Sequence, residues 1–171
     1  CESLQELYVI NEMAHIHGVK ARVSVRINPD IDAHTHKYVT TGLYENKFGI
    51  SQHEFEKLID ILKKSENIQF YGLHFHIGSQ ITRVDEVFAL ECQRVNEIVA
   101  YFERQGLKVN NINLGGGLGV DYDDPDENPI ADFETWFQTI SDNIVKRDDQ
   151  TVHVEPGRSL VAQCATLISR V

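Results

Sequence analysis

Residues that could bind or transform a ligand gather in four short segments, each at the end of a stretch typical of a β-strand. The segments are RINP at 26–29, HFHIGS at 74–79, GGGLG at 115–119 and EPGR at 155–158. Parallel strands place their carboxyl ends along one edge of a sheet, and ligands bind at that edge in α/β proteins. We therefore expect the four segments to form a single site.

The third segment contains three consecutive glycines, Gly115, Gly116 and Gly117. Such a run allows unusual backbone angles and leaves amide N–H groups uncovered, which suits a phosphate. A flexible turn is the alternative. A dinucleotide site is disfavoured, because GGGLG lacks the third glycine of that fingerprint and no acid follows from a next strand about twenty residues later.

Two histidines in the second segment, His74 and His76, lie on the same face of their predicted strand. We interpret His74 as a hydrogen-bonded core residue, because no third ligand of matching character is near enough to suggest a metal site. His76 is closer to the rim and is followed by Gly78 and Ser79. Its imidazole could stack on a planar ring.

The fourth segment places an acid, Glu155, next to Gly157 and Arg158, which suit an anion. Glu155 could be an ordinary solvated acid. Alternatively, the ligand is anionic at one end and cationic at the other, as in pyridoxal phosphate. That cofactor needs amides for its phosphate, a stacking partner for its ring and a carboxylate that keeps its ring nitrogen protonated. The glycines, His76 and Glu155 meet these three needs.

Composition limits the possible functions of the 171 residues. Lys and Arg number 16 against 26 acids, a net charge of −10, which argues against a nucleic-acid partner. No apolar run approaches the ~20 residues of a membrane span, and no signal-peptide pattern opens the sequence. The cysteines, Cys1, Cys92 and Cys164, are odd in number and form no CxxC pair. We expect no disulfide framework, no metal site and a cytoplasmic protein.

The elements that must position the four segments alternate between helical and strand periodicity. Capping patterns at Ser3 and Glu6, at Ser51 and Glu54, and at Thr82 and Asp85 predict three helix starts, and Asp132 precedes a fourth helix that ends in Lys146 and Arg147. The first helix stops at Gly18 and the third near Gly106. Strands are predicted at 22–27, 68–77, 109–114 and 151–155.

This alternation predicts a parallel α/β sheet, because parallel neighbours need a crossover helix. Two architectures fit: an open doubly wound sheet, or part of a (β/α)8 barrel. A whole barrel needs ~250 residues. The chain supplies four of eight units, so the second architecture means half a barrel.

Six motifs resemble the diaminopimelate decarboxylase branch of the barrel-type (fold III) pyridoxal-phosphate-dependent amino-acid decarboxylases, in order and in spacing. They are RINPD at 26–30, THKYVTTG at 35–42, KFGI at 47–50, GLHFHIGSQ at 72–80, NLGGGLGVDY at 113–122 and EPGRSLVA at 155–162. The resemblance implies decarboxylation of meso-2,6-diaminopimelate to L-lysine, the last step of lysine synthesis, in a cytoplasmic homodimer. It also implies that 1–171 is a single partial domain, a TIM-barrel fragment with approximately strands five to eight, without the N-terminal barrel half or the C-terminal β-domain.

The resemblance also implies roles for individual residues. His76 would stack on the cofactor ring, and Glu155 would pair with the ring nitrogen. Arg158 would grip a substrate carboxylate through its bidentate fork, and Arg26 would lie near the ring with a less defined role. The phosphate would be held by Ser79, Gly115, Gly116, Gly117, Gly157 and Arg158. Lys47, in KFGI, would serve subunit contact.

Two family features are missing from the sequence. The family attaches its cofactor to a lysine in a first-strand motif like Y-A-x-K-A-N, and a later segment supplies a substrate-contacting cysteine; neither is found here. We therefore expect the isolated chain to be inactive. Two alternatives remain: another decarboxylase of the family, acting on ornithine or arginine, or a non-catalytic regulatory protein that keeps the cofactor site.

Overall fold

The computed structural model describes residues 1–31, 48–165 and 168–170. In chain order its elements are α1 (Leu4–Ile16), β1 (Ala21–Arg26), η1 (Gln52–Glu54, a 3-10 turn), α2 (Phe55–Lys64), β2 (Ile68–His74), α3 (Val84–Arg104), β3 (Asn111–Asn113), α4 (Phe133–Asn143), β4 (Thr151–His153) and α5 (Gly157–Val161). The motif at 35–42 and Lys47 lie outside the described residues.

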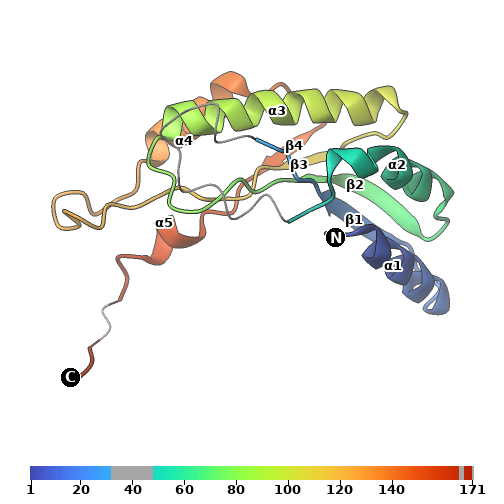
Figure 1. Cartoon of the computed structure of the whole chain (residues 1–171), viewed down its shortest axis with the longest axis horizontal. Coiled ribbons are helices and arrows are strands. Elements are labelled where there is room, and N and C mark those ends of the chain that lie inside the picture. The colour runs from blue at the N-terminus through green and yellow to red at the C-terminus, as the bar shows by residue number, and fades with distance from the viewer. Residues whose placement is uncertain (32–47, 166–167, 171) are drawn as a thin grey trace.

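The four strands form one parallel sheet in the order β1-β2-β3-β4 (Figure 1). Each new strand is added on the same side of the previous one. A doubly wound sheet reverses this direction at a switch point, whereas a barrel keeps it. The strand order therefore favours the barrel of the two predicted architectures.

The two faces of the sheet carry different side chains, because side chains alternate along a strand. Val25, Leu73 and Ile112 occupy one register row and are fully buried beneath the helices. This is the outer face of a barrel. The other face, the inner face, carries the next row, which consists of Arg26, His74, Asn113 and His153.

The helices cover the outer face, with α3 and α4 side by side along it (Figure 1). Phe88 of α3 and Trp136 of α4 are almost fully buried, and their ring centroids lie 5.5 Å apart. Phe102, near the C-terminal end of α3, packs edge to face against Phe55 of α2, with ring centroids 5.1 Å apart. Burying each such ring contributes roughly 1.5–3 kcal/mol. These contacts fix the helical layer on the sheet.

The first two predicted capping patterns form hydrogen bonds, with small differences. Ser3 Oγ accepts from the Glu6 amide at 3.2 Å, but the Glu6 carboxylate returns to the amide of Glu2 instead of Ser3. Ser51 Oγ accepts from the His53 amide and starts the 3-10 turn η1 ahead of α2.

Several predicted boundaries are wrong. The strands predicted at 68–77, 109–114 and 151–155 are shorter, at Ile68–His74, Asn111–Asn113 and Thr151–His153. Two helix boundaries differ as well. α3 begins at Val84 after Arg83, which makes no side-chain cap, so Thr82 does not start the helix. α4 ends at Asn143, three residues before Lys146. There Asn96 of α3 donates to the Asn143 carbonyl and accepts from the Val145 amide, which turns the chain away from the helical path.

Arg147, predicted as the end of α4, instead forms ion pairs with Glu103 and Asp149. Within the described residues, no helix is both long enough and apolar enough to cross a membrane.

Candidate functional site

Backbone hydrogen bonds bring the strand ends of β2, β3 and β4 together. The Phe75 amide donates to the Asn113 carbonyl at 2.7 Å, and the Leu114 amide donates to the His153 carbonyl at 2.9 Å. One step further, the Glu155 amide donates to the Gly115 carbonyl at 2.6 Å. Three of the predicted segments therefore meet at one edge. The first segment follows β1, whose last residue, Arg26, pairs with His74.

The triple-glycine turn lies between its two neighbours at very short range. Gly115 and Gly117 have φ of +69° and +107°, which side-chain-bearing residues rarely adopt. A Cβ on Gly116 would lie 2.0 Å from the Glu155 carbonyl oxygen, and one on Gly115 would lie 2.3 Å from that of Phe75. Glycine is therefore required for this close packing, and the interpretation as a merely flexible turn does not fit.

His76 is fixed against this turn. The amide of Gly116 donates to His76 Nδ1 at 3.2 Å. The imidazole is half-buried, beside the glycines and on the same side as Glu155. Its ring is thus held in place next to a group of backbone amides.

Both oxygens of the Glu155 carboxylate have partners. Asn113 Nδ2 donates to Oε1 at 2.9 Å, and His74 Nε2 lies 3.4 Å from Oε2. The other side-chain atom of Asn113, Oδ1, accepts from the Gly115 amide at 2.9 Å. One amide side chain therefore links the acid to the triple-glycine turn.

The charges of this pair follow from their surroundings. Burial lowers the pKa of His74 despite the opposing effect of Glu155, and the charge of Arg26 lowers it further. Partial burial alone would raise the pKa of Glu155, but the hydrogen bond from Asn113 and the nearby histidines outweigh it and lower that pKa. At neutral pH Glu155 is therefore a carboxylate and His74 is neutral.

Arg158 reaches across to the segment after β2. Its two terminal nitrogens donate to Tyr122 Oη at 2.6 Å and to Ser79 Oγ at 3.1 Å. Within the described residues the guanidinium forms no ion pair with an acid. An arginine held by neutral hydroxyls keeps its charge for an incoming anion.

Arg26 lies in the inner row beside His74, and its side chain is 15% exposed. It forms an ion pair with Glu2 at 2.6 Å, and its Cζ lies 5.2 Å from the Phe48 ring centroid. The structure thus puts Arg26 near the site but already paired. Its place near a cofactor ring stays a prediction.

Three residues contribute to this site without a sequence signal that singles them out. Asn113 and Tyr122 lie inside the motif at 113–122, and His74 lies in a strand whose pattern predicts a core histidine. Its Nε2 instead lies 3.4 Å from an oxygen of the site carboxylate, Glu155. The alternation of β3 gave one usable signal, because it puts Asn113 on the inner face with His74.

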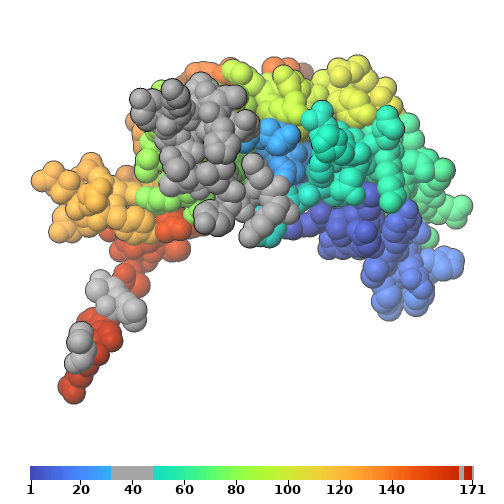
Figure 2. Space-filling view, in the orientation of Figure 1, coloured from blue at the N-terminus to red at the C-terminus, as the bar shows by residue number. Residues whose placement is uncertain are grey.

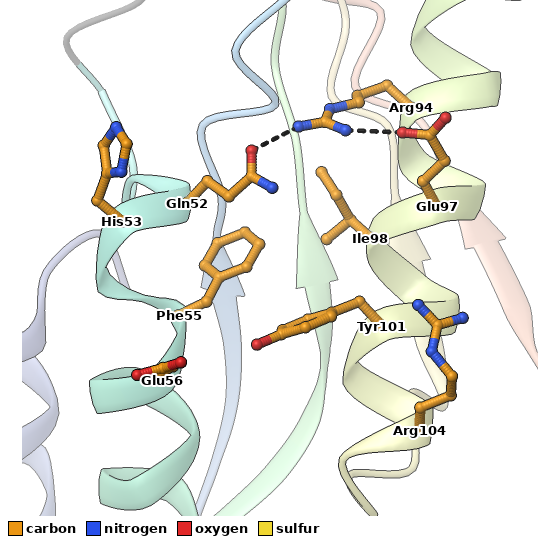
Figure 3. A pocket seen from close by; sticks show the side chains of 9 residues that line it. All are labelled: Gln52, His53, Phe55, Glu56, Arg94, Glu97, Ile98, Tyr101 and Arg104. Carbon is orange, nitrogen blue, oxygen red and sulfur yellow. Dashed lines mark hydrogen bonds and ion pairs between the residues drawn. The ribbon is translucent and has the colours of Figure 1, made fainter.

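A groove of about 530 Å³ lies apart from this site, between α2 and α3 on the helical layer (Figure 3). Its floor contains Phe55, Ile98 and Tyr101. Arg94 spans one end, with hydrogen bonds to Gln52 and Glu97. No residue of the predicted site lines it.

In the space-filling view the loop between β3 and α4 projects from one end of the molecule (Figure 2).

Comparisons with known proteins agree with the fold. The sequence model of the "Pyridoxal-dependent decarboxylase, pyridoxal binding domain" family matches residues 1–162, so the chain belongs to this family. Two relatives are diaminopimelate decarboxylases. The one from Bacteroides thetaiotaomicron is 48% identical over 170 residues, which cover 99% of this chain and 44% of the relative. The one from Helicobacter pylori is 38% identical, covering 99% and 41%.

Solved structures give the same result. The diaminopimelate decarboxylase of H. pylori, in complex with L-lysine, superposes with a TM-score of 0.76 and 39% identity over 94% of this chain and 40% of that one. The arginine decarboxylase of Paramecium bursaria Chlorella virus gives 0.66 and 25% identity over 92% and 38%. The partial-barrel prediction is confirmed. The chain spans about two fifths of the length of these relatives.

Proposed function

We propose that this chain is part of a longer diaminopimelate decarboxylase, which converts meso-2,6-diaminopimelate to L-lysine and carbon dioxide. The 48% identity to the B. thetaiotaomicron enzyme over nearly the whole chain carries this proposal. The H. pylori structure is a complex with L-lysine, which supports an amino-acid ligand. The arginine decarboxylase neighbour is only 25% identical.

Surfaces of the chain support its being one partial domain, 1–171, of that longer protein. On α1, Tyr8, Val9, Met13 and Ile16 are each about half exposed or more. Apolar side chains gathered on one helix mark a surface that packs against something else. We expect a further part of the barrel to cover it, and we expect the whole enzyme to be a cytoplasmic homodimer.

The residues present fit pyridoxal phosphate as the cofactor. The turn from Gly115 to Gly117 approaches its neighbours so closely that no side chain fits there, Glu155 is ionised, and Arg158 has no acid partner in the described chain. The glycine turn suits an anion, and the imidazole of His76 and the carboxylate of Glu155 lie beside it. When bound, this cofactor supplies an electron sink for the bond to the departing carboxylate.

The chain's own residues would hold and orient both the cofactor and the amino-acid substrate. His76 would cover one face of the ring, and Glu155 would accept a hydrogen bond from the protonated ring nitrogen. Ser79, the glycine turn and the backbone at Gly157 and Arg158 would hold the phosphate. The Arg158 side chain would orient a substrate carboxylate through its two terminal nitrogens.

Carbon dioxide release by the longer protein tests the proposal. We expect turnover of meso-2,6-diaminopimelate at least a hundredfold faster, as kcat/KM, than of ornithine or arginine, on the order of the discrimination that buried polar contacts give. A preference for ornithine or arginine would contradict the substrate. The isolated 171-residue chain, assayed alongside, is expected to release no carbon dioxide.

A further inference from the structure

The environment of Glu155 is more specific than its place at a strand end requires. Its side chain is 56% exposed, so without partners it would sample several orientations. Asn113 Nδ2 instead holds Oε1 at 2.9 Å, and His74 Nε2 lies 3.4 Å from Oε2. Each partner comes from a different strand end, and each approaches a different oxygen.

These contacts leave room for a further donor. An ionised carboxylate has about four lone-pair sites; Asn113 donates to one of them on Oε1, and His74 Nε2 lies 3.4 Å from Oε2. Because His74 is neutral, it orients the carboxylate without cancelling its charge. The negative charge of Glu155 stays available for a cationic group that approaches from the open side.

Asn113 does more than orient the acid. Its Oδ1 accepts from the Gly115 amide while its Nδ2 donates to Glu155. The same side chain therefore fixes the spacing between the acid and the triple-glycine turn. A ligand with a phosphate at one end and a ring nitrogen at the other requires a fixed spacing of this kind.

We propose that His74 and Asn113 are positioning residues, which together hold the two oxygens of Glu155 in place for the ring nitrogen of pyridoxal phosphate. The inference rests on the proposed function and deepens it. Neither residue touches the cofactor in this account, since both act through Glu155. Neither role was apparent in the sequence, because the three residues are separated by about forty positions along the chain and meet only at the sheet edge.

The inference is tested by replacing the ring nitrogen itself. The longer protein, freed of cofactor, is titrated with pyridoxal phosphate and with its 1-deaza analogue, in which C–H replaces the nitrogen. The dissociation constant of the deaza analogue, divided by that of pyridoxal phosphate, reports only the affinity that the protein gains from the ring nitrogen. A variant that merely loosens the structure weakens both compounds equally and leaves the ratio unchanged.

His74→Leu and Asn113→Asp are expected to lower this ratio about tenfold each, the loss expected for one hydrogen bond to a charged group. Asn113→Asp retains an acceptor for the Gly115 amide but has no donor for Glu155. His74→Gln retains an N–H donor and is expected to restore most of the ratio.

His153→Leu is the matched control, because His153 pairs with Asn113 in the same inner row but its side chain forms no contact with Glu155. Its ratio is expected to stay within twofold of the original. If His74→Leu fails to fold, the ratio in Asn113→Asp decides.

The outcomes separate the two proposals. Failure of the unaltered protein to bind pyridoxal phosphate would overturn the proposed function, and the inference with it. Normal binding with a ratio that survives both His74→Leu and Asn113→Asp would overturn the inference alone.

Discussion

The two faces of the sheet divide the tasks of the molecule between them. On the outer face, Val25, Leu73 and Ile112 are fully buried beneath the helices. On the inner face, the neighbouring row contains Arg26, His74, Asn113 and His153. The outer row is apolar and the inner row is wholly polar, although the two rows are one residue apart.

The difference shows where this fold can change without loss of structure. Burial of the outer face supplies the free energy of folding, and substitution there leaves cavities. The inner face contributes little burial, so its residues are free to be selected for hydrogen bonding and charge. Variants of the two faces should therefore separate stability from function.

The largest expected effect is on the free energy of unfolding, at the outer face of the sheet. Trp136→Ala removes a ring that is 1% exposed and packed on Phe88, and it should lower the free energy of unfolding by about 3–5 kcal/mol. Chemical denaturation of the longer protein measures this. Phe137→Ala, on the same helix but 50% exposed, is the matched control and should cost about 1 kcal/mol or less. Equal losses would contradict the assignment of the core.

Next in size is an effect on function alone. Glu155→Gln keeps the shape of the side chain but removes its charge, and it should lower kcat for decarboxylation by about a hundredfold or more. The midpoint of unfolding should change little, because the side chain is more than half exposed. A large loss of stability with kcat retained would reverse the assignment of the two faces.

Gly116→Ala tests the contact between neighbouring strand ends. The added Cβ would lie 2.0 Å from the Glu155 carbonyl oxygen, so one of the two backbones must move. Overpacking of this kind costs about 1–3 kcal/mol, and it should weaken pyridoxal phosphate binding by moving Glu155 as well. Cofactor titration is the measurement. Unchanged affinity would show that the turn does not set the position of the acid.

Glu91 is a buried acid among the apolar residues of the helical layer over the outer face. Its replacement is expected to give the smallest effect on stability. Its side chain is fully buried in α3, and among residues 1–31, 48–165 and 168–170 neither carboxylate oxygen has a hydrogen-bond partner. Burial raises the pKa of Glu91 well above its usual value. A raised folded-state pKa favours folding below the unfolded-state pKa, and this contribution is lost as pH rises through the folded-state pKa.

Glu91→Gln should therefore gain stability relative to the unaltered protein as pH rises above the ordinary pKa of a glutamate, until the raised pKa of Glu91 is passed. Denaturation at several pH values measures this difference. A difference that stays constant with pH would mean that Glu91 does not titrate in this range.

The sequence predicted the fold through local signals. Apolar periodicity marked all four strands and the four long helices, and Ser3 formed its predicted cap. One error came where a distant residue decides a boundary. α4 stops at Asn143 because Asn96, on another helix, captures the following backbone, and no local pattern contains that contact.

The site divides in the same way. His76, Glu155 and the triple-glycine turn could be singled out, because their residue types are unusual at strand ends. Asn113 could not, since an asparagine in a strand has many roles and its partner Glu155 is known only once β3 and β4 are aligned. Tyr122 is found for the same reason only through its bond to Arg158.

The central claim is that the strand ends of this chain hold one cofactor between an acid and a glycine turn. A crystal structure of the longer protein with pyridoxal phosphate tests it most directly. The account predicts a ring nitrogen within about 2.7–3.2 Å of a Glu155 oxygen, with the phosphate at the turn from Gly115 to Gly117. A ring nitrogen facing solvent, or a phosphate bound elsewhere, would contradict it.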